Sequence, residues 1–119
     1  MQSVEHFDVV VVGGGPSGAT AATDLAGLGK RVLVLERAFR IKPCGGAIPP
    51  RAIEDFDIPP HLIVAKIKSA RMISPKDARV DMPVGDTYVG MVDRDVFDPW
   101  LRERARGAGA EVRTATFKQ

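Results

Sequence analysis

The sequence predicts an α/β fold built on a parallel sheet, and three observations support this class. An aliphatic run over 9–12 lacks alternation and enters a glycine-rich turn, as expected for a central parallel strand buried on both faces. Small and apolar residues then recur at helical spacing from Pro16 to Gly29, where glycine supplies the stop. A second aliphatic run over 32–35 completes a strand, helix and strand unit.

The middle of the chain departs from this alternation. Residues 41–50 are too rich in Pro and Gly for regular structure. Beyond them we expect a short helix that begins at the prolines of 49–50, strands over 65–73 and 78–82, and a further strand over 88–92. The four-residue connection at 74–77 has turn chemistry, so the strands it joins form an antiparallel excursion from the parallel domain.

A second long helix and a last strand, over 110–114, follow. Between Asp93 and Gly109 one helical face collects the apolar positions Val96, Phe97, Trp100, Leu101, Ala105 and Ala108. Pro99 leaves two alternatives: the helix starts with Asp98 as its cap, or an opening turn from Asp95 precedes a kink. Asp93, Asp95 and Asp98 are interpreted as charges that favour a helix start rather than as catalytic acids.

Composition limits the function classes. The chain has 119 residues, 45% of them hydrophobic, and a net charge of +2, typical of a soluble globular domain. Lys and Arg are scattered among Asp and Glu, which argues against nucleic-acid binding. The longest aliphatic run is far short of a membrane span, and without a secretion signal we expect a cytoplasmic location. A single cysteine excludes an internal disulfide, and two isolated histidines predict no metal site.

The turn after the first strand reads Gly13-x-Gly15-x-x-Gly18. Glycine at 13 permits a sharp turn, glycine at 15 removes the Cβ from backbone that approaches a pyrophosphate, and glycine at 18 lets the helix lie close to the strands. Pro16 and Ser17 open the helix, whose free N–H groups and positive dipole end favour phosphate. This order of elements is typical of a dinucleotide-binding site.

An acid closes the second strand. Glu36 lies 18 residues after Gly18, where its oxygens would accept hydrogen bonds from both hydroxyls of an adenosine ribose. Because a buried carboxylate without a partner is costly, this placement favours a ligand. Arg37 has two interpretations, as a partner for an adenosine 2′-phosphate or, more commonly at a strand end, as a solvent-facing side chain.

Four further stretches carry a family resemblance: Lys42-Pro-Cys-Gly-Gly-Ala-Ile-Pro-Pro50, Phe56-Asp-Ile-Pro59, Ala70-Arg-Met-Ile-Ser-Pro75 and Gly90-Met-Val-Asp-Arg-Asp-Val-Phe-Asp98. On these residues the chain resembles the geranylgeranyl reductases of chlorophyll and bacteriochlorophyll synthesis, and most of all the bacteriochlorophyll type. The resemblance covers essentially the whole chain. Its Cys-Gly-Gly loop after a ribose acid is much more specific than the glycine triplet.

The resemblance implies an enzyme that binds FAD, takes its electrons from NADPH and saturates three isolated double bonds of a geranylgeranyl chain to give phytyl. The substrate is either the pigment ester or geranylgeranyl diphosphate. An isolated alkene has no carbonyl to stabilise a carbanion, so hydride transfer needs a positioned proton donor and a dry tunnel, neither of which is visible here. Such a hydrophobic substrate is compatible with peripheral attachment of the enzyme to a membrane.

The resemblance also implies that residues 1–119 are the N-terminal part of a Rossmann-like FAD-binding domain. The second cofactor-contacting segment and the substrate domain of family members have no counterpart in the sequence. We therefore expect the isolated chain to be catalytically inactive, to bind FAD weakly or not at all, and to associate through open sheet edges.

Residue by residue, the resemblance assigns the phosphate turn to Gly13, Gly15, Ser17 and Gly18, the ribose contact to Glu36, the loop that approaches the flavin to Cys44, Gly45 and Ala47, and a fork-shaped phosphate-side donor to Arg94. Cys44 is either a redox or proton-relay residue or a small side chain in a tight loop. The glycine pair at 45–46 serves either close approach to the cofactor or chain reversal alone.

Other functions stay open at this point. Another FAD-dependent oxidoreductase or monooxygenase of the same fold would carry the same fingerprint. A pyridine-nucleotide dehydrogenase would too, but it would continue with alternating helices and parallel strands after Cys44. A non-enzymatic nucleotide-binding module would make no particular demand on Cys44 or Arg94.

Overall fold

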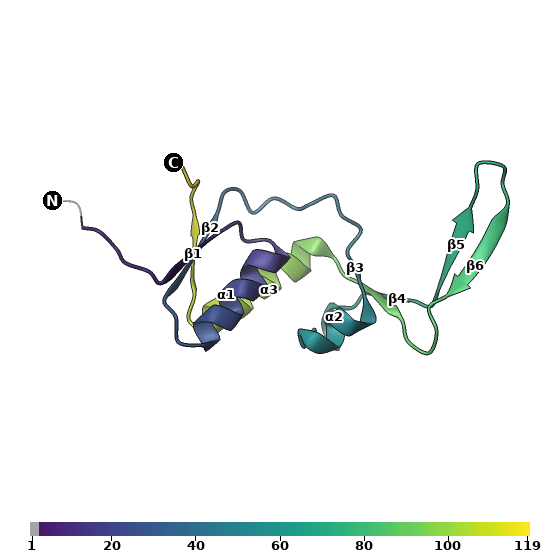
Figure 1. Cartoon of the computed structure of the whole chain (residues 1–119), viewed down its shortest axis with the longest axis horizontal. Helices are drawn as coiled ribbons and strands as arrows, with labels where there is room; N and C mark the ends of the chain where they lie inside the picture. The colour runs from purple at the N-terminus through teal and green to yellow at the C-terminus, as the bar shows by residue number, and fades with distance from the viewer. Residues whose placement is uncertain (1–2) are drawn as a thin grey trace. The chain divides into compact units, whose positions relative to one another are not determined.

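The computed structural model describes residues 3–119, which divide into two compact units. The first unit combines the chain up to Lys42 with residues from Phe97 onwards, and the second unit comprises Pro43–Val96. Figure 1 shows the elements of each. No helix within residues 3–119 is long and apolar enough to cross a membrane.

The first unit is a parallel sheet with helices, as the sequence predicts. Its elements are β1 (Val9–Val12), α1 (Pro16–Gly27), β2 (Val32–Glu36), most of α3 (Arg94–Ala108) and β8 (Glu111–Thr114). The strands lie in the order β1-β2-β8 and both pairs are parallel. The carboxyl ends of the strands therefore share one edge, where open α/β sheets bind their ligands.

The core of this unit lies on the face of the sheet that carries the helices. Small side chains of α1 and α3 pack there on aliphatic side chains of β2; the buried residues are Ala22, Ala26, Val32, Val34, Ala105 and Ala110. The prediction that 9–12 is buried on both faces is wrong, because β1 is an edge strand and alternates. Val12 is 61% exposed, and only the central β2 buries both of its faces.

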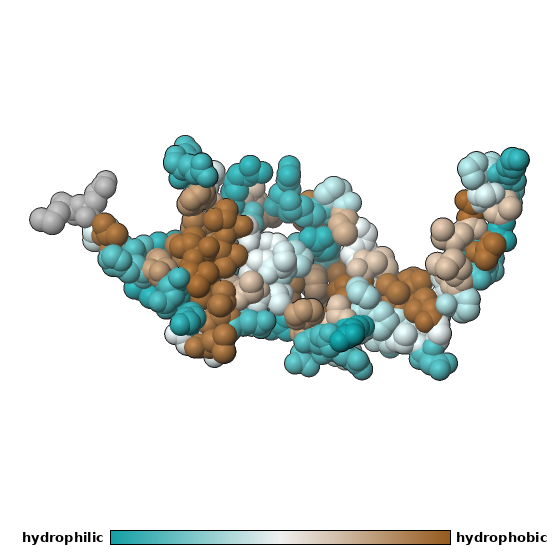
Figure 2. Space-filling model, viewed as in Figure 1, coloured by the Kyte–Doolittle hydropathy of each residue, from teal (hydrophilic) through white to brown (hydrophobic). Residues whose placement is uncertain are grey.

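Figure 2 shows hydrophobic residues gathered over the sheet of β1, β2 and β8. Val10 and Val12 are the exposed aliphatic side chains of β1. They alternate with Val9 and Val11, which pack against the core. The sheet thus keeps an open apolar face on the side away from its helices.

Helix α1 ends as predicted. Gly29 adopts a left-handed conformation with φ +82°, and its N–H donates to the carbonyl of Ala26 at 3.0 Å. The N–H of Lys30 reaches back to the carbonyl of Leu25 at 3.1 Å. This pair of bonds is the glycine-terminated helix end that returns the chain toward β2.

Helix α3 runs without interruption through Pro99, which excludes Asp98 as its cap. Its opening turn is closed by a hydrogen bond from the N–H of Val96 to the carbonyl of Asp93 at 3.0 Å. The predicted apolar face is confirmed at Phe97, Leu101 and Ala105 but is wrong at Val96, which is exposed. Two charged residues, Asp98 and Arg102, are also buried.

The second unit contains the predicted antiparallel excursion. Its elements are β3 (Ala47–Ile48), α2 (Pro50–Asp55), the 3₁₀ helix η1 (Pro60–Leu62), β4 (Ala65–Ile67), β5 (Ser69–Ile73), β6 (Arg79–Pro83) and β7 (Val89–Met91). One sheet has the order β3-β7-β4, and β5 and β6 form a separate hairpin.

The prediction of one strand over 65–73 is wrong, since the strand is split at Lys68. Residues before the split pair with β7 and residues after it pair with β6. The predicted turn at 74–77 is confirmed: the N–H of Ala78 donates to Oγ of Ser74 at 3.0 Å, and Asp77 has φ +60°. The chain changes its partner strand at Lys68, which the periodicity of a single run does not reveal.

A candidate nucleotide site at the edge of the sheet

The glycine turn after β1 is fastened to the neighbouring strand. Gly13 has φ +106°, and its N–H donates to the carbonyl of Leu35 at 2.8 Å. A Cβ added at Gly18 would lie 2.0 Å from the carbonyl oxygen of Gly13, far inside van der Waals contact. Both glycines therefore have the roles predicted for them, a sharp turn and close approach of the helix to the strand.

The start of α1 leaves backbone donors without helical partners. Gly15 is the N-cap, Pro16 is the first helical residue, and no side chain caps the helix. The first intrahelical bond runs from the N–H of Ala19 to the carbonyl of Gly15 at 2.9 Å, so the N–H groups of Ser17 and Gly18 have no acceptor within the helix. With no acidic residue in its first turn, this end of α1 favours an anion.

Gly15 differs from its neighbours in having no structural need to be glycine. Its backbone is extended with φ −73°, and a Cβ added there would meet no atom within 4 Å. Any small residue would therefore fit at this position in the chain itself. A glycine that the fold does not require agrees with a ligand that approaches the backbone closely.

Glu36 ends β2 beside this turn. Its Oε2 accepts the N–H of Gly14 at 2.5 Å, and its Oε1 accepts the N–H of Ala38 at 3.2 Å. Partial burial raises the pKa of Glu36, but these two hydrogen bonds and the charge of Arg102 outweigh burial and bring the pKa below its ordinary value. The carboxylate is therefore ionised at neutral pH and serves as an acceptor.

Backbone donors already offset the cost of burying the charge of Glu36, so its burial alone does not require a ligand. A carboxylate offers about four acceptor positions. Two backbone bonds leave capacity for ribose hydroxyls. Contact between Glu36 and ribose stays a prediction, supported by its place at the carboxyl edge of the sheet.

Sequence reasoning missed two residues of this site, Gly14 and Arg102. Arg102 is only 9% exposed, and its Nη1 donates to the carbonyl oxygen of Gly14 at 2.9 Å. A Cβ added at Gly14 would lie 3.2 Å from Cβ of Glu36 and 3.4 Å from Cδ of Arg102. A signal was present, because Arg102 follows Asp98 and precedes Ala105 at the spacing of the buried face of α3.

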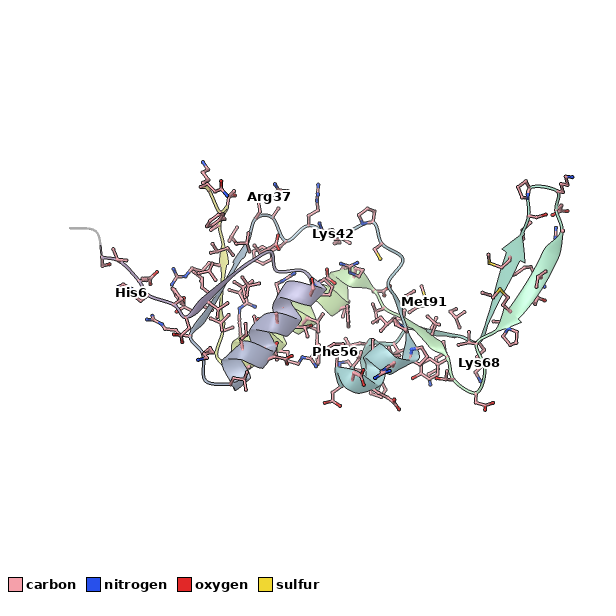
Figure 3. All side chains as sticks on the ribbon, viewed as in Figure 1. His6, Arg37, Lys42, Phe56, Lys68 and Met91 are labelled. Carbon is pink, nitrogen blue, oxygen red and sulfur yellow. The ribbon has the colours of Figure 1, made fainter. Side chains whose placement is uncertain are left out.

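Arg37 is exposed in the loop that follows β2 (Figure 3). It lines a small pocket of about 220 Å³ together with Val12, Gly13, Leu35 and residues 115–117. Its exposure agrees with the solvent-facing interpretation. A contact with a nucleotide stays a prediction.

The other predicted cofactor residues belong to the second unit. Cys44 is exposed and forms no disulfide, Ala47 pairs with Met91 between β3 and β7, and Arg94 is the half-buried first residue of α3. Gly45 has open space where a Cβ would lie. Their contacts with a cofactor stay predictions.

Gly46 has a structural explanation of its own. Its φ is +74°, and an added Cβ would lie 2.2 Å from the carbonyl oxygen of Val92. The N–H of Val92 in turn donates to the carbonyl of Gly46 at 3.0 Å. Chain packing alone therefore requires glycine at 46, whereas nothing in the chain requires it at 45.

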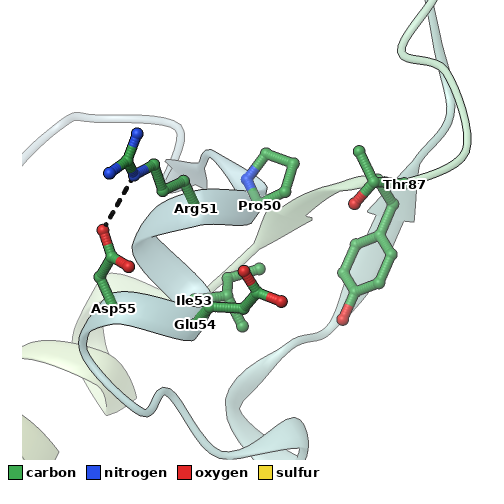
Figure 4. A pocket seen from close by; sticks show the side chains of 7 residues that line it. Pro50, Arg51, Ile53, Glu54, Asp55 and Thr87 are labelled. Carbon is green, nitrogen blue, oxygen red and sulfur yellow. Dashed lines mark hydrogen bonds and ion pairs between the residues drawn. The ribbon is translucent and has the colours of Figure 1, made fainter.

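A larger hollow of about 710 Å³ lies in the second unit (Figure 4). It is lined by Pro50, Arg51, Ile53, Glu54, Asp55, Thr87 and Tyr88. Nε of Arg51 and Oδ2 of Asp55 form an ion pair at 3.2 Å, and both side chains are solvent-exposed. No predicted site residue lines it. Residues 3–119 also hold no cluster of three His, Cys, Asp or Glu that would bind a metal.

Comparisons with known proteins define the class. The family model described as FAD dependent oxidoreductase matches residues 8–47, which include the glycine turn and Glu36. A geranylgeranyl bacteriochlorophyll reductase-like protein from Thermoplasma acidophilum superposes with a TM-score of 0.82 and 31% identity, over 94% of this chain and 30% of that one. A myxobacterial halogenase at 24% identity and TM-score 0.80 shares the fold. The chain has the Rossmann-type fold of FAD-dependent oxidoreductases.

The sequence relatives are more specific. Geranylgeranyl diphosphate reductase of Rhodobacter capsulatus is 64% identical over 93% of this chain, and the chloroplastic enzyme of Oryza sativa subsp. japonica is 47% identical over 98%. Digeranylgeranylglycerophospholipid reductase 2 of Methanopyrus kandleri is 43% identical over 90%. The chain spans only 28%, 26% and 28% of the lengths of these relatives. Within that span its sequence is similar to those of geranylgeranyl reductases.

Proposed function

We propose that this chain forms the nucleotide-binding part of an FAD-dependent reductase that saturates the isolated double bonds of a geranylgeranyl chain, with NADPH as the reductant. The observation that carries the proposal is the 64% identity, over 93% of the chain, with a geranylgeranyl diphosphate reductase. The glycine turn supports it, because Gly15 is free to meet a ligand and the N–H groups at the start of α1 lack helical acceptors.

The residues present fit the adenosine end of FAD. The N–H groups of Ser17 and Gly18 would bind the pyrophosphate, and the ionised Glu36 would accept hydrogen bonds from ribose hydroxyls. When bound, FAD supplies hydride chemistry toward the alkene. The chain's own contribution is to bind and orient the nucleotide with preformed backbone donors.

On the flavin side we assign supporting roles to residues of the second unit. The exposed Cys44, with Gly45 and Ala47, is assigned to the loop beside the flavin, and Arg94 to a donor toward the phosphates. Cys44 needs no redox role for this. Its small side chain is sufficient in a tight loop.

The substrate class is a geranylgeranyl group, carried by a bacteriochlorophyll or chlorophyll pigment or by a diphosphate. Relatives named for the diphosphate and for a glycerophospholipid share this segment. The segment therefore serves the prenyl chain or the cofactor that they have in common, rather than the carrier. We propose that the enzyme is cytoplasmic and meets its greasy substrate at the photosynthetic membrane surface.

The proposal is tested by a chimera in which this chain replaces the matching segment of the Rhodobacter capsulatus reductase. We expect NADPH-dependent conversion of geranylgeranyl diphosphate to the phytyl product at a rate within tenfold of the unaltered relative. A Gly18→Val chimera, in which the side chain meets the Gly13 carbonyl, serves as the inactive control. A folded, FAD-loaded chimera with no alkene reduction would refute the proposed function.

A further inference from the structure

A buried arginine joins helix α3 to the nucleotide-binding turn. Resting on the site proposed above, we propose that Arg102 is a positioning residue, which holds the Gly14 peptide and thereby fixes Glu36 and the glycine turn relative to each other. Arg102 lies 88 residues after Gly14, so the contact is tertiary and not a local turn feature. Its side chain is almost fully buried.

The hydrogen bonds form a connected series. Nη1 of Arg102 donates to the carbonyl oxygen of Gly14 at 2.9 Å. The N–H of the same Gly14 donates to Oε2 of Glu36 at 2.5 Å. Both backbone polar groups of Gly14 are therefore occupied, one by the helix and one by the acid. Movement of Arg102 would break its hydrogen bond to the Gly14 carbonyl. It would also disturb the bond between the Gly14 N–H and Glu36.

Packing reinforces this series. The space where a Gly14 side chain would lie is bounded by Cβ and Oε2 of Glu36 and by Cδ of Arg102, all at 3.2 to 3.4 Å. The glycine is thus enclosed between the acid and the aliphatic stem of the arginine. Close packing of this kind leaves the turn little room to shift independently of α3.

The loop after Glu36 is held by the same arginine. The guanidinium of Arg102 lies 4.9 Å from the centre of the Phe39 ring, within the range of a cation–π contact. Phe39 has φ +41°, a left-handed conformation that is unfavourable for a bulky residue. Strain of this kind persists where surrounding contacts support it, and the Arg102 guanidinium is one of the contacts around Phe39.

Arginine suits this position better than lysine. Its guanidinium donates to the Gly14 carbonyl while its central carbon lies over the Phe39 ring, and a planar group with several donors suits both contacts. An ammonium group donates as a point charge and offers no flat face. Buried charge is costly, and Glu36, whose pKa the guanidinium helps to lower, supplies the compensating charge.

The test uses the 119-residue chain with ADP as the probe, because ADP is the part of FAD that the turn would contact. Arg102→Met keeps the length of the side chain but removes charge and donors, and Arg102→Lys keeps the charge. Arg106→Met is the matched control on the same helix, since Arg106 is exposed and pairs with Glu103. Three quantities are measured: the ADP dissociation constant, the Gly14 amide NMR resonance and the Glu36 carboxyl titration.

We expect Arg102→Met to shift the Gly14 amide, raise the pKa of Glu36 and weaken ADP binding at least tenfold, with Arg106→Met unchanged in all three. Arg102→Lys should retain most of the Glu36 shift yet still move the Gly14 amide and weaken ADP binding severalfold. A purely structural arginine would lower the melting temperature alone. Unchanged Gly14 and Glu36 signals in folded Arg102→Met would overturn the proposal.

If Arg102→Met does not fold, the Arg102→Lys variant tests the positioning role. An unchanged Gly14 amide resonance in Arg102→Lys would then overturn that role. If the unaltered chain does not bind ADP, the proposal that the isolated chain forms a nucleotide site is refuted. The Gly14 and Glu36 signals still decide the role of Arg102 in that case. The two failures are therefore distinguishable.

Discussion

At the scale of single residues, the glycines of this chain are glycine for different reasons, and the turn offers a matched pair. Gly18→Ala places a Cβ 2.0 Å from the carbonyl oxygen of Gly13, whereas Gly15→Ala places one in open space. We expect the first change to lower the free energy of unfolding by about 1–3 kcal/mol, as overpacking does, and the second to leave it unchanged. Urea denaturation followed by circular dichroism measures both. Equal stability of the two variants would contradict this interpretation.

The second unit holds a similar pair. Gly46→Ala imposes a side chain on a residue with φ +74° and drives it into the carbonyl of Val92, while Gly45→Ala meets no atom. We expect only Gly46→Ala to increase hydrogen exchange of the Val92 amide, whose acceptor is the Gly46 carbonyl. Protection that is the same in both variants would show that the reversal tolerates a side chain.

Glu36 predicts a dependence of stability on pH. Because its folded pKa is lowered, its contribution is present above the unfolded pKa of about 4.3 and is lost as pH falls through the lower folded pKa. We expect the free energy of unfolding of the chain to fall below about pH 5 more steeply than that of Glu36→Gln. The pKa of Glu5 is also lowered, by its hydrogen bond to Arg113. The informative quantity is therefore the difference between the two proteins, and parallel curves would contradict the role of Glu36.

At the scale of elements, the sequence patterns correctly predicted the helix ends and turns that depend on neighbouring residues. The stop of α1 at Gly29, the proline start of α2 and the hairpin turn at 74–77 depend on residues within a few positions of one another. Two features did not follow from such patterns. The split at Lys68 depends on which distant strand each half pairs with, and the exposure of β1 depends on its place at the edge of the sheet.

The candidate site also contains residues that the sequence predicts and others, such as Arg102, that it does not. The glycine turn and Glu36 follow from spacing along the sequence, and the structure brings them together through the bond between Gly14 and Glu36. Arg102 has the spacing of the buried face of α3, but charged residues on an amphipathic helix are normally assigned to the solvent face. Only the tertiary placement of α3 against the turn gives it a partner.

Helix α3 supplies a prediction at this scale, because it continues through Pro99. Proline removes the N–H that would bond the Asp95 carbonyl, which lowers the free energy of unfolding by about 3 kcal/mol. It raises that free energy by about 1 kcal/mol because it restricts the unfolded chain. We expect Pro99→Ala to raise the free energy of unfolding by about 2 kcal/mol, measured by urea denaturation. A loss of stability would show instead that the fold uses a proline-dependent distortion of the helix.

At the scale of the whole molecule, the open face of the parallel sheet predicts self-association. Val10 and Val12 are 46% and 61% exposed on a strand that also has a free edge. We expect the sedimentation coefficient to rise with concentration, and the Val10→Thr and Val12→Thr double variant to reduce this rise because threonine keeps strand propensity. Val4→Thr, at an exposed position before the sheet, is the control. Association that the double variant does not alter would place the contact elsewhere.

In the proposed function, the turn at Gly13–Gly18 binds the nucleotide of FAD together with Glu36. The most direct measurement is the FAD content of the Rhodobacter capsulatus chimera after gel filtration, compared with that of its Gly15→Trp variant. Gly15 has open space around it, so tryptophan disturbs a ligand rather than the fold. We predict stoichiometric FAD in the chimera and its loss in a Gly15→Trp variant that retains the same circular dichroism. Retention of FAD by that folded variant would contradict the claim.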